Sequence, residues 1–151
     1  MRRNRRDDFS RRLVRENHLT VDDLIYPVFG IEGCNKTQEV QSMPGVKRYS
    51  PDELLKVAEK CVTLGIPSIA LFPVVSQQLK TPLAEEAYSE NGLVPQTVSM
   101  IKREFPDLGV ITDVALDPYT SHGQDGLVND IGYILNDETV DVLVQQALTH
   151  A

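Results

Sequence analysis

The segment Ser68-Ile-Ala-Leu-Phe-Pro-Val-Val75 decides the fold, because it is apolar along almost its whole length. A strand with one face in water alternates polar and apolar residues, whereas a parallel strand that is covered on both faces forms a continuous apolar run. Residues 24–31 and 109–116 have the same character. The sequence therefore predicts three strands of one parallel sheet.

A helix is predicted over residues 51–64, directly before this segment. Ser50 can cap the helix, Pro51 suits its first position, and Glu53 can complete a capping box. Gly65 is placed to end it. Four apolar residues recur at helical spacing and predict the buried face. They are Leu54, Ala58, Cys61 and Val62.

Two more helices follow the later strands. Residues 93–105 form one of them, which Pro106 ends. Its apolar stripe comprises Val94, Val98, Ile101 and Phe105. Asn136 or Asp137 is expected to cap the other helix. The apolar residues of that helix recur at almost ideal period, and they are Val140, Leu143, Val144, Ala147 and Leu148.

Alternating strands and helices predict an α/β fold with parallel strands and right-handed crossovers. A (β/α)8 barrel takes roughly 250 residues, and three units leave a sheet edge bare. We expect residues 23–151 to be an incomplete (β/α)8 TIM barrel, its N-terminal part of about three βα units. The alternative is a small doubly wound domain, but three strands are few and no Gly-rich phosphate loop follows the first strand.

The N-terminal residues differ in charge from the rest of the chain. Residues 1–18 carry seven arginines against three carboxylates, whereas the remainder carries eight Lys and Arg against 19 Asp and Glu. We interpret residues 1–22 as a basic arm that docks on an acidic surface of another subunit. A solvated tail is the plain alternative. Nucleic acid is not expected as a partner, because the arm has one aromatic residue and no groove-reading motif.

The compartment is predicted from three features of the sequence. No run of about 18 apolar residues is present, so we expect no membrane span. The N-terminal residues do not form a secretory signal. Cys34 and Cys61 cannot make a disulfide framework, and free thiols favour a cytoplasmic location.

The segment after the third strand carries the candidate chemistry. Asp113 interrupts an apolar run, so its carboxylate needs partners or a wet cavity. By strand periodicity Asp113 and Asp117 face the same side, where two carboxylates bind Mg²⁺, orient an amine or divide acid and base roles. Turn formation is the alternative for Asp117 and Asp125, because Asp-Pro and Asp-Gly favour turns. Zinc is not expected, since CxxC and HxxxH spacings are absent.

The six lysines do not offer an activated amine. A nucleophilic lysine needs an apolar setting that lowers its pKa, and no lysine lies inside a predicted strand. Three are at exposed helix positions and three are in loops. They are Lys56, Lys60 and Lys102, and Lys36, Lys47 and Lys80.

Seven short motifs are spread along the chain. They are Arg11-Arg-Leu-Val-Arg-Glu-Asn, Asp23-Leu-Ile-Tyr-Pro-Val-Phe, Ser42-Met-Pro-Gly-Val, Gly65-Ile-Pro, Ala70-Leu-Phe-Pro-Val, Asp113-Val-Ala-Leu-Asp-Pro-Tyr-Thr-Ser-His-Gly-Gln-Asp-Gly and Asn136-Asp-Glu-Thr-Val. In this order and spacing the chain resembles the N-terminal half of the delta-aminolevulinic acid dehydratase family, also called porphobilinogen synthases. The resemblance implies a (β/α)8 barrel whose N-terminal arm wraps a neighbouring subunit, usually in a homo-octamer.

The resemblance also implies an activity. The family condenses two 5-aminolevulinate molecules into porphobilinogen with loss of two waters, in cytoplasmic tetrapyrrole and haem biosynthesis. Zinc-dependent members have cysteines where this chain has Ala115, Asp117 and Asp125. The chain therefore looks like the magnesium-responsive, zinc-independent branch.

The resemblance assigns roles to the residues of the 113–126 segment. Asp113 matches an active-site aspartate near the Schiff-base lysines of the family. Asp117 and Asp125 would be active-site carboxylates that position the second amine or contact a cation. Four residues would belong to the substrate-side loop: Tyr119, Thr120, Ser121 and His122.

The resemblance also implies what these 151 residues lack. In the family the two Schiff-base lysines, the carboxylate-binding residues, the lid and the allosteric Mg²⁺ ligand all come later in the chain. We therefore expect this chain alone to be inactive and, with uncovered apolar strands, to associate or unfold in part. The alternative function is a non-catalytic assembly partner that binds full-length subunits through its arm.

Overall fold

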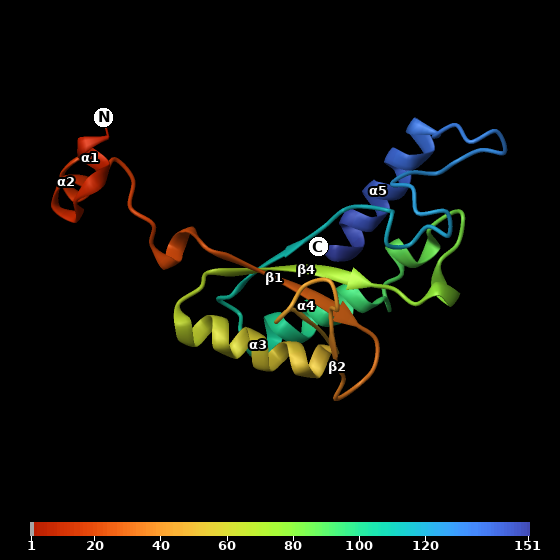
Figure 1. Cartoon of the computed structure of the whole chain (residues 1–151). Coiled ribbons are helices and arrows are strands. Elements are labelled where there is room, and N and C mark those ends of the chain that lie inside the picture. The colour runs from red at the N-terminus through yellow and green to blue at the C-terminus, as the bar shows by residue number, and fades with distance from the viewer. Residues whose placement is uncertain (1) are drawn as a thin grey trace.

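The three predicted strands lie side by side and parallel in the sheet of the computed structural model, which describes residues 2–151 (Figure 1). They are β1 (Ile25–Ile31), β4 (Ser68–Val74) and β5 (Gly109–Thr112). β1 pairs with β4 from Ile25 opposite Ser68 to Ile31 opposite Val74, and β4 pairs with β5. The predicted parallel strands are confirmed, but β5 ends at Thr112, four residues earlier than expected.

A hairpin extends the sheet beyond β1. Its strands are β2 (Thr37–Glu39) and β3 (Lys47–Tyr49), which pair antiparallel, and β3 runs parallel to β1. The strand order is β2-β3-β1-β4-β5. Sequence analysis gave no sign of this hairpin, because strands of three mostly polar residues leave no apolar pattern to detect. The hairpin covers one edge of the sheet, and β5 forms the other.

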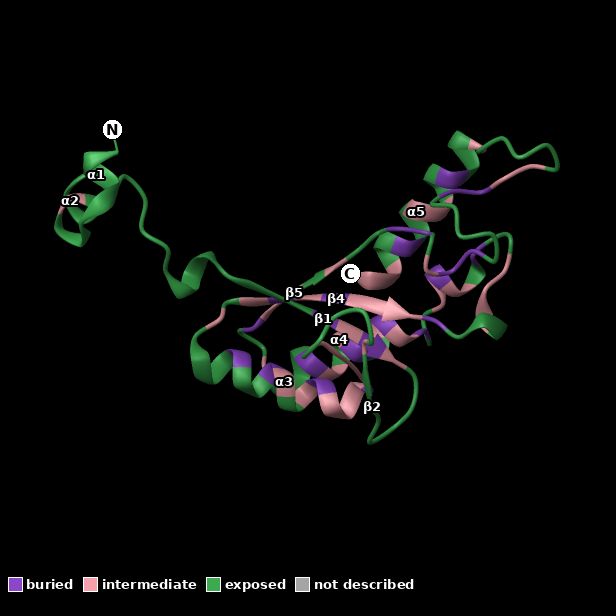
Figure 2. Ribbon diagram, viewed as in Figure 1, coloured by how far each residue is buried: buried purple, intermediate pink, exposed green. Residues whose placement is uncertain are grey.

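Helices α3 (Pro51–Leu64) and α4 (Leu93–Glu104) cover one face of the sheet (Figures 1 and 2). Val28, Ile69 and Leu71 point from the strands toward them. The helices contribute Leu54, Ala58, Cys61, Val94 and Ile101 to the same core. The predicted faces are confirmed at these positions, whereas Val62 is exposed. Gly65 ends α3 with φ at 74°, a left-handed conformation that glycine adopts without strain.

The capping box predicted at the start of α3 does not form. Ser50 is the N-cap residue, but its hydroxyl accepts no backbone N–H of the first turn. Instead it accepts the backbone N–H of Lys36 at 2.9 Å and donates to Asp52 Oδ1 at 2.7 Å. Glu53 pairs with Lys56 at 2.6 Å. The serine therefore ties the β2–β3 hairpin to the helix rather than capping the helix.

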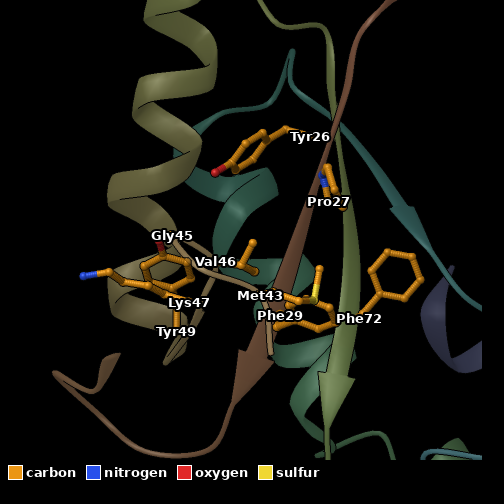
Figure 3. Close-up of a pocket in the computed structure, with 9 residues that line it drawn as sticks. All are labelled: Tyr26, Pro27, Phe29, Met43, Gly45, Val46, Lys47, Tyr49 and Phe72. Atoms are coloured by element: carbon orange, nitrogen blue, oxygen red, sulfur yellow. The ribbon is translucent and has the colours of Figure 1, made fainter. Parts of the chain in front are cut away.

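The opposite face of the sheet has no helix over it within residues 2–151. Phe29 of β1 and Phe72 of β4 lie on this face and, with Met43 of the hairpin turn, line an apolar cavity of about 320 Å³ (Figure 3). In a (β/α)8 barrel the helices lie outside and the opposite strand faces fill the interior. The uncovered face is therefore the one that belongs inside a barrel.

A second core lies beyond the carboxyl ends of the strands. It contains Val75, Ala84, Ala87, Leu116, Tyr119 and Leu127. The short helices η2 (Gln77–Leu79) and η3 (Glu85–Tyr88) contribute to it, and the last helix, α5 (Asn136–His150), packs on η3. This core joins the long loops to α5 rather than joining helices to the sheet.

The orientation of α5 contradicts its apolar periodicity. Val140, Val144 and Leu148 are 49%, 53% and 73% exposed, whereas Thr139 and Gln146 are buried. The predicted caps were also wrong, because α5 begins at Asn136 with Leu135 as N-cap and has no side-chain cap bond. The predicted Leu143 does pack on the second core with Val142. The fully buried positions are polar because the helix also packs on loops whose backbone groups need hydrogen-bond partners.

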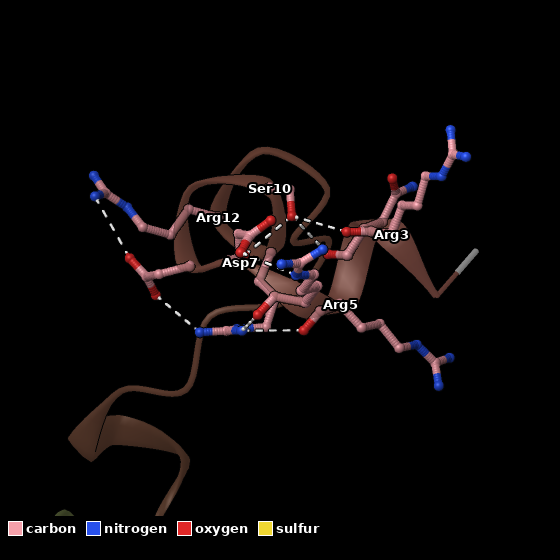
Figure 4. Close-up of polar contacts among 9 residues, drawn as sticks. Arg3, Arg5, Asp7, Ser10 and Arg12 are labelled. Carbon is pink, nitrogen blue, oxygen red and sulfur yellow. Dashed lines mark hydrogen bonds and ion pairs between the residues drawn. The ribbon is translucent and has the colours of Figure 1, made fainter.

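The N-terminal residues extend away from the sheet (Figure 1). They form α1 (Arg3–Arg6), α2 (Asp8–Leu13) and η1 (Val21–Asp23), and none of these helices contains a buried residue. Their contacts are local (Figure 4): the Ser10 hydroxyl reaches the carbonyl oxygens of Arg3 and Asp7, and Arg11 and Arg12 pair with Asp8. Across the described residues no helix is both long and apolar enough to cross a membrane.

Candidate functional site

The loops that follow β4 and β5 are joined beyond the carboxyl ends of the strands. Thr81 and Thr120 form an isolated parallel bridge. The Thr81 N–H donates to the Tyr119 carbonyl at 3.1 Å, and the Ser121 N–H donates to the Thr81 carbonyl at 3.0 Å. Ligands bind at this end of the strands in α/β folds. We call residues 113–127 the substrate-side loop from here on.

Asp113 is the first residue of this loop after β5. Its side chain is exposed and lines a cavity of about 290 Å³ together with Phe72 and Thr112. The Asp113 carboxylate therefore borders an open cavity and is not buried in the core. Asp117 is not among the residues lining that cavity, because strand periodicity ends at Thr112 and does not carry the orientation of Asp113 forward.

Asp125 closes the loop on itself. Its Oδ1 accepts the Leu116 N–H at 2.6 Å, nine residues earlier in the chain. Its side chain is otherwise exposed, as is that of Asp117. This contact spans the loop and is not the local Asp-Gly turn that the sequence offered as an alternative. The exposure of the Asp125 side chain leaves its carboxylate accessible.

The other predicted loop residues fall into a buried pair and an exposed pair. Tyr119 and Thr120 are buried, and Ser121 and His122 are exposed. The Thr120 hydroxyl donates to the Gln124 carbonyl at 2.8 Å, and the Gln124 N–H donates to His122 Nδ1 at 3.2 Å. The loop is therefore ordered by its own side chains, which keeps its exposed polar groups in fixed positions.

Tyr119 is a neutral phenol in this setting. Burial raises the pKa of Tyr119 to about 12, the nearby carboxylates of Glu86 and Asp113 add to the rise, and hydrogen bonding from Gln146 opposes it. A phenol with this pKa does not act as a base near neutral pH. Its hydroxyl is a hydrogen-bonding group beside Gln146.

Gln146 is the site-associated residue that sequence reasoning missed. It is fully buried on α5, and its Nε2 donates to the Ala115 carbonyl at 3.1 Å. A signal was present in the sequence, because Gln146 follows Leu143 by three residues and so lies on the same helix face. The prediction of the core face considered only the apolar residues of the helix and so passed over Gln146.

The lysine contacts fit structural roles. Lys47 lies 2.9 Å from Glu39 and Lys56 lies 2.6 Å from Glu53, and these hydrogen-bonded carboxylates raise the pKa of both amines. A nucleophilic lysine needs the opposite shift. Lys102 Nζ donates to the Leu108 carbonyl at 3.0 Å and so closes the end of α4.

No group of three or more His, Cys, Asp or Glu side chains among residues 2–151 is arranged to hold a metal ion. A cation at Asp117 or Asp125 would therefore take its remaining ligands from water or from groups outside these residues. Carboxylate oxygens suit Mg²⁺, which commonly keeps several waters.

A sheet with helices on one face and polar loops at the carboxyl ends of its strands defines the class as part of a (β/α)8-barrel protein. The model of the delta-aminolevulinic acid dehydratase family matches residues 1–151. The chain belongs to this family, and the predicted resemblance is confirmed.

Individual relatives agree with the family match. The delta-aminolevulinic acid dehydratase of Bradyrhizobium diazoefficiens is 56% identical over 150 residues, which cover 99% of this chain and 42% of the relative. The chloroplastic enzyme of Chlamydomonas reinhardtii is 45% identical over 152 residues and is covered over 39% of its length. The chain therefore spans about two fifths of the relatives it matches.

A solved structure confirms the predicted partial barrel. The crystal structure of the Toxoplasma gondii delta-aminolevulinic acid dehydratase, in complex with the reaction product porphobilinogen, superposes with a TM-score of 0.92 at 43% identity. The match covers 99% of this chain and 42% of that chain.

Proposed function

We propose that residues 1–151 supply one wall of a porphobilinogen synthase active site. The reaction would condense two 5-aminolevulinate molecules into porphobilinogen with loss of two waters, in tetrapyrrole and haem biosynthesis. Family membership supports this proposal, as does the likeness to a relative solved with porphobilinogen. The observation that carries it is the placement of Asp113 at a cavity lined by residues of β4 and β5, next to an ordered polar loop.

In this proposal the carboxylates act on the substrate amine. The ammonium group of 5-aminolevulinate would pair with Asp113, with Asp117 and Asp125 completing a negatively charged edge. A charge-assisted hydrogen bond between ammonium and carboxylate is both short and strong, so it orients as well as binds. Thr120, Ser121 and His122 would set the shape of the same edge.

Binding of 5-aminolevulinate to the purified chain tests this wall. We expect Asp113→Asn to weaken binding by about tenfold, because one charge-assisted hydrogen bond contributes about 1.5–3 kcal/mol. The matched control is Asp107→Asn, which removes an equally exposed carboxylate from the turn between α4 and β5. Equal affinities for D113N and the unaltered chain would contradict the proposal.

We also propose that the Schiff-base amine comes from outside these residues. The observed carboxylate pairing of Lys47 and Lys56 supports this, because it favours the charged and unreactive ammonium. Incubation of the chain alone with 5-aminolevulinate should therefore yield no porphobilinogen. Product formation would contradict the proposal.

For the whole protein we propose a cytoplasmic enzyme that responds to Mg²⁺. The support is the donor set, because Asp117 and Asp125 offer carboxylate oxygens, Ala115 has no side-chain donor atom, and none of the three positions carries a thiolate. Activity restored by Mg²⁺ after chelation, and not by Zn²⁺, is the expected result. Restoration by Zn²⁺ alone would contradict it.

A second candidate function is assembly through the N-terminal arm, in which the whole protein would form a homo-oligomer such as an octamer. Phe9 and Leu13 are 67% and 82% exposed on α2, and an apolar pair with no cover suits a protein surface better than nucleic acid or water. Co-migration of the chain with a full-length family member on size-exclusion chromatography is expected, and deletion of residues 1–22 should abolish it. Binding to nucleic acid that falls steeply with salt would contradict this candidate.

A further inference from the structure

The inward face of α5 carries two buried polar residues, Thr139 and Gln146, beside the half-buried Val142 and Leu143, and its polar contacts include the substrate-side loop. The Thr139 hydroxyl accepts the Leu127 N–H at 2.9 Å and donates to the Leu135 carbonyl at 2.6 Å. One heptad later, Gln146 Nε2 donates to the Ala115 carbonyl at 3.1 Å. The helix therefore holds the loop near both of its ends.

Gln146 contacts a peptide group whose carbonyl and N–H are both hydrogen-bonded to side chains. The Ala115 carbonyl and the Leu116 N–H belong to one planar peptide unit. Gln146 binds the carbonyl of this unit, and Asp125 Oδ1 accepts its N–H at 2.6 Å. A hydrogen bond to the carbonyl polarises the unit and strengthens its N–H as a donor. Gln146 is thus linked to Asp125 through a single rigid group.

The same peptide region sets the next turn of the loop. The Leu116 carbonyl accepts the N–H groups of Tyr119 and Thr120, both at 2.9 Å. Tyr119 is 4% exposed and packs in the second core beside Leu116 and Leu127. The position of the 115–116 peptide therefore determines where the buried part of the loop lies.

Stability alone does not account for a glutamine at this position. Gln146 is fully buried, and its Oε1 has no hydrogen-bond partner among residues 2–151. An unpaired buried polar atom destabilises a fold, and a methionine of similar shape would avoid that penalty. What a methionine lacks is the donor that reaches Ala115.

We propose that Gln146 is a positioning residue that fixes the Asp125 carboxylate through the Ala115–Leu116 peptide. This rests on the proposed function, in which Asp125 belongs to the substrate edge. Gln146 itself is remote from solvent and does not touch substrate. Its role is to hold one oxygen of Asp125 in place so that the other faces outward.

Hydrogen exchange of the Leu116 amide in the full chain tests this inference. In Gln146→Met we expect this amide to exchange about five- to tenfold faster, as loss of one hydrogen bond predicts. The amides of Ile69 and Leu71 in β4 should not change. The matched control is Gln145→Met, which alters the neighbouring exposed glutamine. An unchanged Leu116 amide in Q146M, or faster exchange at all three amides by the same factor, would overturn the inference.

A pH profile separates positioning from packing. In Gln146→Glu the protonated carboxyl can donate to the Ala115 carbonyl, whereas the ionised form cannot. Protection of the Leu116 amide relative to Ile69 should therefore be near that of the unaltered chain at acidic pH and fall as the pH rises. Q146M should show no such profile. A flat profile in Q146E would contradict the inference.

The double variant Q146M/D125N tests the coupling itself. Residues linked through one hydrogen-bonded group are not additive, so the second substitution should add less than it does alone. Full additivity would overturn the link to Asp125. If 5-aminolevulinate does not bind the unaltered chain but Leu116 still depends on Gln146, the proposed function fails and the positioning role stands.

Discussion

α3 and α5 are helices of almost equal length, each with apolar residues at helical spacing, yet the fully buried side chains of α3 are apolar and those of α5 are polar. α3 (Pro51–Leu64) buries Leu54, Ala58 and Cys61 against the sheet. α5 (Asn136–His150) buries Thr139 and Gln146 against a loop and leaves Val140, Val144 and Leu148 exposed. A sheet presents side chains to a helix, whereas a loop presents backbone groups that need hydrogen bonds. The difference separates the helix that builds the fold from the helix that holds the site.

The largest effect is expected in α3. Leu54 is fully buried in the core, so Leu54→Ala should lower the free energy of unfolding by about 2–5 kcal/mol. Denaturant unfolding measures this loss. A change below about 1 kcal/mol would mean that α3 does not carry the fold as the packing implies.

A smaller but still large effect is expected at Thr139 in α5. Thr139→Val keeps the shape but leaves the buried Leu127 N–H without its acceptor, which should cost about 1–3 kcal/mol. Thr63→Val in α3 is the matched control, since that hydroxyl is exposed and bonds only the Glu59 carbonyl. Equal losses in T139V and T63V would show that the loop does not depend on α5.

The pH dependence of α5 should be set in part by His150. Burial lowers the pKa of His150, so the folded chain favours the neutral ring. As the pH falls through about 6.5 the unfolded chain takes up the proton first, and stability that is full above this pH is lost below it. In His150→Gln the fall in unfolding free energy between pH 7 and pH 5 should be smaller than in the unaltered chain. An equal or steeper fall would contradict the burial of this ring.

The smallest effect is expected on the outward stripe of α5. Val144 is 53% exposed, so Val144→Ser should change the free energy of unfolding by less than about 0.5 kcal/mol. The same measurement on Val94→Ser, at a buried position of α4, provides the contrast. A loss above about 1 kcal/mol in V144S would show that the stripe is covered in solution and that α5 resembles α3 after all.

The apolar patterns in the sequence predicted those elements that pack through apolar side chains. The strands β1 and β4, the core face of α3 and its end at Gly65 could all be predicted, because continuous apolar runs and a left-handed glycine have specific physical causes. The β2–β3 hairpin could not, since its strands are short, polar and held by the Ser50 hydroxyl rather than by a core. The prediction of the buried face of α5 missed Thr139 and Gln146 for the same reason, because these residues are held by hydrogen bonds and leave no apolar pattern.

The features of the candidate site also divide into those that the sequence could predict and those that it could not. The location of the substrate-side loop followed from the order of strands and loops, and Asp113 stood out because a carboxylate interrupted an apolar run. The orientation of Asp117 could not be predicted, because it depends on where β5 ends. The spacing from Leu143 could have placed Gln146 on the inward face of α5, but no local pattern contains its contact with Ala115, 31 positions away.

The most direct test of the account is an amide chemical-shift map of the chain titrated with 5-aminolevulinate. The account predicts that the shifts concentrate at residues 113–125 and extend to α5 through Ala115 and Leu116, while α3 stays unchanged. Shifts on α3 or the arm with none in the substrate-side loop would contradict it.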